Sequence, residues 1–172
     1  MSGHSKWKQI KHKKEATDKK RGQAFSKLLK AVRVAAKTEP NPEFNPRLRS
    51  IIAKAKEQNV PQENIERALK QSEGKDLEDL LIEAYGPGGT AIIIEAITDN
   101  RNRTISEIKN ILNEARGKFA EPGSVLWVFE KNSELPWQPK FNQEKTPEDI
   151  GGLRKLIDEV SQHDDVQNVY HN

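Results

Sequence analysis

The sequence contains no cysteine, a single methionine, and aromatic residues at only 6% of its 172 positions. Without cysteine, the chain has no disulfide framework, no thiolate nucleophile and no Cys-ligated metal. No apolar run approaches the roughly 20 residues that span a bilayer. The first residues carry charge where a signal peptide needs an apolar stretch. These features predict a cytoplasmic protein without a membrane segment.

Motifs for catalysis are also scarce. The histidines His4, His12, His163 and His171 lack metal-ligand spacing, and no local motif suggests a Ser-His-Asp triad. The run His163-Asp164-Asp165 could be interpreted as a set of metal ligands, but a polar loop before the last strand is the favoured interpretation. The loop Gly86-Pro87-Gly88-Gly89 lacks the Lys-Ser/Thr ending of a nucleotide-binding loop and is interpreted as a hairpin turn. We therefore expect no enzyme, no metal, no cofactor and no small-molecule substrate.

Charge is unevenly distributed along the chain. Residues 1–70 carry 18 Lys+Arg and 7 Asp+Glu, whereas residues 71–172 carry 11 and 19. The overall net charge of +3 therefore combines a strongly basic half with an acidic one. A solubilising charged tail is the alternative, but solubility needs no such asymmetry. The pattern predicts that the first half binds a polyanion, with nucleic acid as the partner.

The first half reads as a helical domain over residues 1–75. We expect residues 1–16 to form a flexible arm, because they have no sustained apolar period. From Asp18 an apolar stripe with helical spacing begins. The stripe consists of Phe25, Leu28, Leu29, Val32 and Ala36. Asn45-Pro46 predicts the cap and first position of a second helix, and Val60-Pro61 the start of a third.

The second half, residues 76–172, alternates strands and helices. The predicted strands are 81–85, 91–97, 125–129, 135–141 and 166–170, and the predicted helices are 105–116 and 146–160. Three consecutive isoleucines in the second strand indicate burial on both faces, and Gly117 suits a left-handed helix cap. The fold class is therefore α+β: a three-helix domain followed by a ferredoxin-like βαββαβ domain with an extra strand before it.

Candidate phosphate-binding residues gather in the first half. Lys6, Lys8, Lys11, Lys13 and Lys14 surround Trp7 and His12. Such cations neutralise phosphates while an indole stacks on an unpaired base. Trp7 could instead anchor the arm to the helices, and His12 could be a solvated neighbour of the cations.

Further basic candidates lie on the predicted helices. Lys19, Lys20 and Arg21 oppose the dipole near the start of the first helix, which suggests phosphate contact. Arg47 and Arg49 extend the patch, with salt bridges to Glu43 or to neighbouring helices as an equal alternative.

The second half contains one candidate phosphate-binding site. Arg101 and Arg103 lie between a strand and a helix, where free backbone amides and guanidinium groups could hold a phosphate. A capped loop whose arginines pair with local acids is the alternative.

Several sequence blocks, collinear from residue 1 to residue 170, match one known family. They are the N-terminal run MSGHSKWKQIKHKK, NPRLR at 45–49, NIERA at 64–68, YGPGG at 85–89, TDNRNRT at 98–104, PGSV at 122–125 and DDVQNVY at 164–170. With these blocks the chain closely resembles the YebC family, which includes the mitochondrial translational activator of cytochrome oxidase subunit one.

The resemblance implies both a fold and two activities. Family members are similar to a three-domain crescent in which the third domain is inserted after the strand that is Val125 to Phe129 here. In this chain Glu130 to Leu135 turns directly into the next strand, so the inserted domain is expected to be missing. The family is described as probable DNA-binding transcriptional regulators, and the resemblance also implies a role at the ribosome, where other relatives assist translation. A protein-interaction adaptor is a third hypothesis.

Overall fold

The computed structural model describes residues 3–71, 77–131 and 137–172, with side chains from Lys11 onward except those of His12 and Lys13. The chain divides into two compact units, Met1–Lys75 and Asp76–Asn172. The first unit contains only helices among its described residues, and the second combines helices with sheet. This confirms the α+β class and the order of a helical unit followed by a sheet unit.

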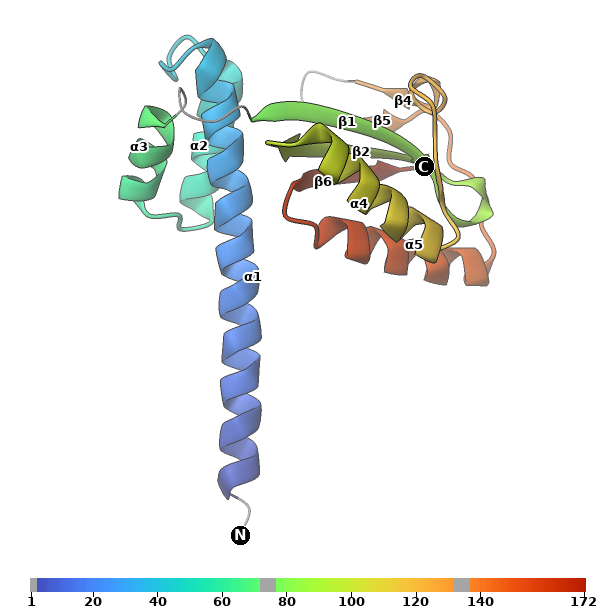
Figure 1. The fold of residues 1–172 in the computed structure, drawn as a ribbon, viewed down its shortest axis with the longest axis horizontal. Helices are drawn as coiled ribbons and strands as arrows, with labels where there is room; N and C mark the ends of the chain where they lie inside the picture. Colours follow the sequence, from blue (N-terminus) through green and yellow to red (C-terminus); the bar gives the residue numbers. More distant parts are fainter. Residues whose placement is uncertain (1–2, 72–76, 132–136) are drawn as a thin grey trace. The chain divides into compact units, whose positions relative to one another are not determined.

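The first unit consists of α1 (Gly3–Thr38), α2 (Pro46–Glu57) and α3 (Gln62–Lys70) (Figure 1). Among the described side chains, those of the C-terminal part of α1 pack against the other two helices, through Val32, Leu28 and their neighbours. Leu48 of α2 and Ile65 of α3 are buried in the same contacts. Three amphipathic stripes thus cover one another, as the apolar spacing predicts.

The connection between α1 and α2 depends on Asn45. Its Nδ2 donates to the carbonyl oxygens of Ala35 and Glu39 at 2.8 and 2.7 Å. Its Oδ1 accepts from the backbone N–H of Leu48 at 3.0 Å, and Pro46 takes the first helical position. One buried side chain therefore ends α1 and begins α2, and the predicted cap is confirmed.

The predicted arm is wrong for residues 3–16, because α1 begins at Gly3 rather than near Asp18. The prediction required a sustained apolar period, and Trp7 and Ile10 are the only large apolar residues of the predicted arm after Met1. Residues 4–21 nevertheless contain neither glycine nor proline, and most are Lys, Gln, Glu, Ala or Arg, which favour helix. Local propensity therefore continues the helix beyond the part that packs.

The second unit is built on a four-stranded antiparallel sheet in the order β3-β1-β2-β6. The strands are β1 (Glu78–Tyr85), β2 (Ala91–Thr98), β3 (Lys118–Phe119) and β6 (Val166–His171). The helices α4 (Arg101–Glu114) and α5 (Pro147–Ser161) lie on one face (Figure 1). The hairpin turn predicted at Gly86–Gly89 joins β1 to β2.

The central strand β2 is buried on both faces, as its isoleucines predict. Ile92 and Ile94 pack with residues of α4 and α5. Ile93 faces the other side, where Val125 and Phe129 cover it. All three isoleucines are at most 1% exposed. The segment after β3 therefore supplies the second covering layer of the sheet.

That covering segment differs from the predicted βαββαβ arrangement. Residues 126–128 form a short 3-10 turn, η2 (Leu126–Val128), instead of a strand. β4 (Phe129–Glu130) pairs only with β5 (Gln138–Pro139), in a separate two-stranded sheet. The prolines in the predicted 135–141 strand disfavour a central place, and β1 lies inside the main sheet instead. Residues 132–136, part of the predicted connection, lie outside the described residues.

Gly117 does not provide the left-handed cap predicted for α4. Arg116 adopts positive φ, at 57°, and the N–H of Gly117 bonds Leu112 O at 2.7 Å. Gly117 is needed for another reason: a Cβ there would lie 2.9 Å from the carbonyl oxygen of Tyr85. The glycine lets the end of α4 approach the sheet closely.

Candidate nucleic-acid interface

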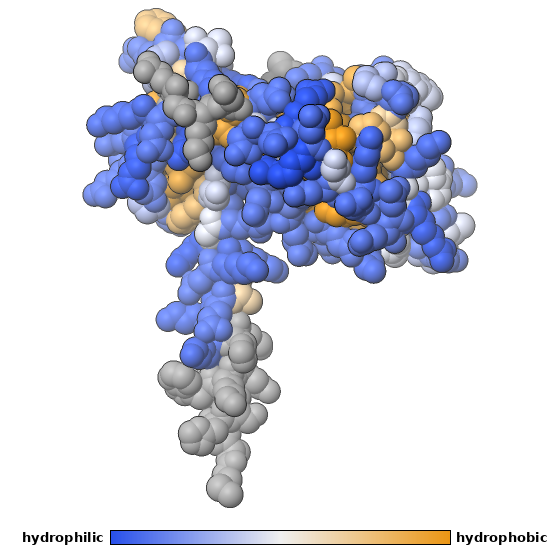
Figure 2. Space-filling view, in the orientation of Figure 1, coloured by the Kyte–Doolittle hydropathy of each residue, from blue (hydrophilic) through white to orange (hydrophobic). Residues whose placement is uncertain are grey.

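The N-terminal part of α1 is basic, and its described side chains form no buried apolar face. Every described side chain from Lys11 to Gly22 is exposed, and the first buried residue of α1 among those described is Leu28. Figure 2 shows mainly hydrophilic surface along this stretch. The exposed set includes the predicted candidates Lys11, Lys14, Lys19, Lys20 and Arg21.

These cations point in several directions around the helix axis. At 3.6 residues per turn, Lys14, Lys19 and Lys20 lie about a third of a turn apart when viewed along the axis. None of the three makes an ion pair within the described part of the chain. Positive charge therefore surrounds the helix and does not form a single stripe.

Two neighbouring cations do have local acidic partners. Lys11 Nζ lies 4.0 Å from Glu15, and Arg21 Nη2 lies 3.3 Å from Asp18. Both pairs are at least half exposed, so each contributes little to stability. A partner phosphate can replace these carboxylates at small cost.

A helix that is polar on every side does not gain stability from packing. The first turn of α1 has no acidic residue, so its unpaired N–H groups and positive dipole end lack a compensating charge. An anion bound along this helix would relieve the repulsion between its cations. The arrangement thus suits a polyanionic partner.

Five further predicted candidates lie in the first three turns of α1. The backbone of Lys6, Trp7, Lys8, His12 and Lys13 is helical, but their side chains lie outside the described residues. Whether Trp7 stacks on a base or anchors the helix stays a prediction.

Arg47 and Arg49 are exposed on the first turns of α2. Arg49 Nη1 donates to the carbonyl oxygens of Pro42 and Glu43 at 3.4 and 3.3 Å. It therefore supports the preceding loop through backbone carbonyls and does not form the salt bridge to Glu43 that was one of the alternatives. The same loop exposes 73% of Phe44.

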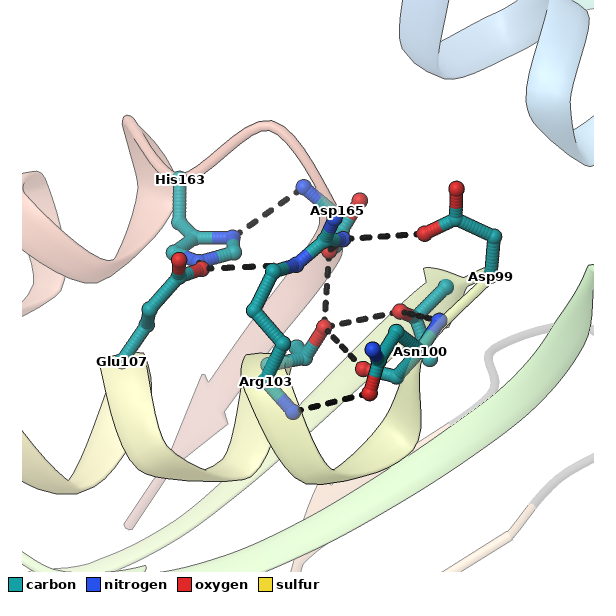
Figure 3. A network of polar contacts seen from close by, with 8 residues as sticks. Asp99, Asn100, Arg103, Glu107, His163 and Asp165 are labelled. Carbon is teal, nitrogen blue, oxygen red and sulfur yellow. Dashed lines mark hydrogen bonds and ion pairs between the residues drawn. The ribbon is translucent and has the colours of Figure 1, made fainter.

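Arg103 is held by three carboxylates and not left open for a phosphate (Figure 3). Its Nη2 lies 2.7 Å from Asp165 and 3.1 Å from Asp99, and its Nε lies 3.9 Å from Glu107. The hydrogen bond to Asp165 raises the pKa of the Arg103 guanidinium, and the three negative charges add to this effect. Of the two interpretations left open, the structure favours local acid pairing. Arg101 remains exposed at the first position of α4.

A polar network behind Arg103 joins the end of β2, the start of α4 and the turn before β6 (Figure 3). Asp165 is 3% exposed and also accepts from Thr104 Oγ1 at 2.7 Å. Thr104 Oγ1 also lies 2.8 Å from Thr98 Oγ1, and Asn100 caps α4 by accepting from the N–H of Arg103. The block at 98–104 is therefore used to close the fold.

His163 completes this network. Its Nε2 lies 2.7 Å from Glu107, while its Nδ1 accepts from the backbone N–H of Asp165 at 3.1 Å. The second bond leaves the proton on Nε2 and makes Glu107 the acceptor. Within the described ranges no group of three acidic or histidine side chains is arranged to hold a metal ion.

Sequence reasoning missed two carboxylates that organise the other face of the sheet. Glu83 of β1 is 5% exposed and accepts from the backbone N–H groups of Gly123, Val125 and Leu126 at 2.5, 2.7 and 3.0 Å. The conspicuous block PGSV at 122–125 was the available signal. This block supplies two of the three backbone N–H groups that donate to Glu83.

Glu95 of β2 is the second missed carboxylate. It accepts from Trp137 Nε1 and Asn168 Nδ2, both at 2.9 Å, and from the Tyr170 hydroxyl at 3.3 Å. Burial, together with this negative charge, raises the pKa of Tyr170 well above its ordinary value. Glu95 thereby ties β6 and the Trp137 side chain to the central strand.

Taken together, the two units define a class of protein in which a basic helical unit precedes an acidic α+β unit. Comparison with known proteins identifies this class. The TACO1/YebC protein N-terminal domain matches residues 5–75, and the TACO1/YebC second and third domain matches residues 77–135. The chain belongs to the TACO1/YebC family.

Relatives from several bacteria are similar over most of the chain. A protein of Citrifermentans bemidjiense is 44% identical over 170 residues, which cover 96% of this chain and 68% of the relative. One of Solibacter usitatus is 48% identical over 139 residues, covering 78% and 56%. Both are named probable transcriptional regulatory protein. The chain thus spans between about half and 70% of the length of such relatives.

A third relative shows that the length differs. The alignment with a probable transcriptional regulatory protein of Thermoanaerobacter pseudethanolicus is 37% identical over 237 positions and covers all of this chain and 96% of the relative. Because this chain has 172 residues, the relative carries residues without a counterpart here.

The fold also matches a solved structure. A conserved hypothetical protein of Aquifex aeolicus superposes with a TM-score of 0.81 at 31% identity, covering 88% of this chain and 89% of that one. Separately, no helix within the described ranges is both long and apolar enough to cross a membrane.

Proposed function

We propose that this chain is a nucleic-acid-binding regulator of gene expression that holds phosphate groups through the N-terminal half of α1. The observation that carries the proposal is the exposure of every described side chain from Lys11 to Gly22, with cations on all sides. The names of its relatives, probable transcriptional regulatory proteins, support a regulatory role.

The dimensions of the helix suit a polyanion. At 1.5 Å per residue, the stretch from Gly3 to Gly22 is about 30 Å long. Duplex DNA carries one negative charge for about every 1.7 Å of its axis, so a basic helix of this length meets many phosphates. Release of condensed counterions would drive binding, and the affinity would fall steeply with salt.

Duplex DNA is the first candidate target, because the relatives are named as transcriptional regulators. Contacts made by lysines around a helix fix position on the phosphate backbone but carry little sequence information. We therefore expect recognition of shape and charge, with weak discrimination between base sequences.

Ribosomal RNA is the second candidate, and the directions of Lys14, Lys19 and Lys20 favour it. A duplex lying beside α1 meets the cations of one side, whereas folded RNA can present phosphate on several sides at once. A translation factor that contacts the ribosome would use all three directions.

Fractionation of cell extracts on sucrose gradients, combined with footprinting on promoter DNA, separates the two candidates. A translation factor sediments with ribosomes or a subunit and is released by high salt. A transcriptional regulator stays at the top and protects particular duplex sites well above random DNA. Absence of salt-dependent binding to both DNA and RNA would refute the proposal.

A further inference from the structure

The second unit exposes two aromatic side chains at one end of the β4–β5 ribbon. Trp127 is 63% exposed and Phe141 is 59% exposed. An exposed tryptophan loses the favourable burial of a large apolar surface. The local fold covers neither ring, so the two exposed positions require an explanation.

The ribbon register brings the two residues together. Phe129 pairs with Pro139, and the N–H of Lys140 donates to Val128 O at 2.9 Å. The two segments therefore still run side by side at Val128 and Lys140. Trp127, in the η2 turn, and Phe141 each lie one residue beyond this backbone bond, so both exposed side chains belong to the same end of the ribbon.

The tryptophan is fixed in place, not loosely attached. Its indole Nε1 donates to the carbonyl oxygen of Ser124 at 2.8 Å. The Glu83 carboxylate fixes the same 123–126 turn, because it accepts hydrogen bonds from three backbone N–H groups of that turn. The ring is thus oriented before any partner arrives, and little conformational entropy is lost on binding.

Positive charge accompanies these rings although the unit as a whole is acidic. Lys140 Nζ lies 3.2 Å from the carbonyl oxygen of Trp127, beside the exposed indole. Lys131 Nζ lies 5.2 Å from the ring centroid of the neighbouring Trp137. Glu130 is the one acidic residue among 126–131 and 137–141, so the described ribbon carries a net positive charge.

We propose that Trp127 and Phe141 form a stacking site for unpaired bases of single-stranded nucleic acid, with Lys140 contacting an adjacent phosphate. Exposed aromatic rings beside cations are how single strands are bound without sequence preference. A continuous duplex keeps its bases stacked internally and cannot use the site. The inference rests on the proposed function and adds to α1 a second contact that requires unpaired bases.

Two matched substitutions test the site. Trp127→Phe and Trp127→Leu both lose the bond to Ser124, but only phenylalanine keeps an aromatic face. Binding of oligo(U), oligo(dT) and a duplex of the same length is measured by fluorescence anisotropy with the full chain. Base stacking predicts that leucine weakens single-strand binding about 5- to 100-fold, that phenylalanine largely restores it, and that duplex binding is unchanged.

Tryptophan fluorescence gives an independent measurement. In a Trp7→Phe background, oligo(U) should quench the emission, and the further change Trp127→Phe should remove most of the quenching. Equal loss of oligonucleotide binding in the phenylalanine and leucine variants would show that an aromatic face is not what the site contributes, and would overturn the inference.

Failure of this site can be told apart from failure of the proposed function. Lys14→Gln/Lys19→Gln/Lys20→Gln should weaken both duplex and single-strand binding. If that triple variant weakens binding while Trp127→Leu has no effect, α1 is the interface and the stacking site is refuted. Thermal unfolding of each variant confirms that the exposed positions leave the fold intact.

Discussion

The two units use charged side chains in opposite ways. In the second unit, the buried carboxylates of Glu83 and Asp165 receive short hydrogen bonds from several donors, and even the guanidinium of Arg103 is engaged by acids. In the first unit, Lys14, Lys19 and Lys20 extend from an exposed helix and make no ion pair among the described residues. Charge therefore holds the sheet unit together, whereas on α1 it remains available to a partner.

This difference predicts that removing a charge from the second unit costs stability. Asp165→Ala should lower the free energy of unfolding by about 3 kcal/mol, since hydrogen bonds to charged groups contribute about 1.5–3 kcal/mol each. Asp99→Ala removes an exposed partner of the same arginine and should cost at most about 1 kcal/mol. Urea unfolding measures both, and equal effects would contradict the structural role assigned to Asp165.

The next largest loss of stability is expected from the replacement of a glycine. Gly117→Ala would place a Cβ 2.9 Å from Tyr85 O and 3.2 Å from Leu112 O, both backbone atoms that cannot move aside easily. We expect a loss of about 1–3 kcal/mol, the range for overpacking. An unchanged melting temperature would show that α4 does not approach the sheet as described.

Tyr170 makes the second unit sensitive to alkali. A raised pKa means that the folded state binds the phenol proton more tightly than the unfolded state does. The stabilisation is complete below the ordinary pKa of about 10 and is lost above it, by at most about 1.4 kcal/mol per pH unit. Comparison of native and Tyr170→Phe unfolding at rising pH isolates this contribution. Parallel pH curves for the two proteins would count against it.

The smallest expected change in stability comes from a substitution in the exposed part of α1. Gly22→Ala meets no atom within 4 Å and should stabilise α1 by about 0.5–1 kcal/mol, because alanine is the better helix former. Circular dichroism should show equal or greater helicity. Lower helicity would contradict the helical conformation of α1 around Gly22.

Features set by local chemistry could be predicted from the sequence. Asn45-Pro46 contains its own cap and first helical residue, and the isoleucines of β2 specify burial on both faces wherever the strand lies. The family resemblance, carried by collinear blocks, is confirmed by the matches to both family models.

Features set by distant partners could not be predicted. The bond from Arg103 to Asp165 joins residues 62 positions apart, so local spacing gave only two competing interpretations. The pairing of β4 with β5 outside the main sheet depends on β1 occupying a central position, which apolar alternation does not reveal. The helical residues 3–16 were missed because periodicity detects packed faces, and this stretch has no apolar face to pack.

The central claim, that free charge on α1 binds nucleic acid, is tested most directly by two variants with the same change in net charge. Lys14→Gln/Lys19→Gln/Lys20→Gln alters α1, and Lys118→Gln/Arg154→Gln/Lys155→Gln alters exposed positions of the second unit. The measurement is the slope of log affinity against log salt concentration for duplex DNA and for RNA. The account predicts that the first variant reduces the slope by about 0.7–0.9 for each phosphate that its side chains no longer neutralise, and that the second leaves the slope unchanged. Equal slopes for the two variants would contradict it.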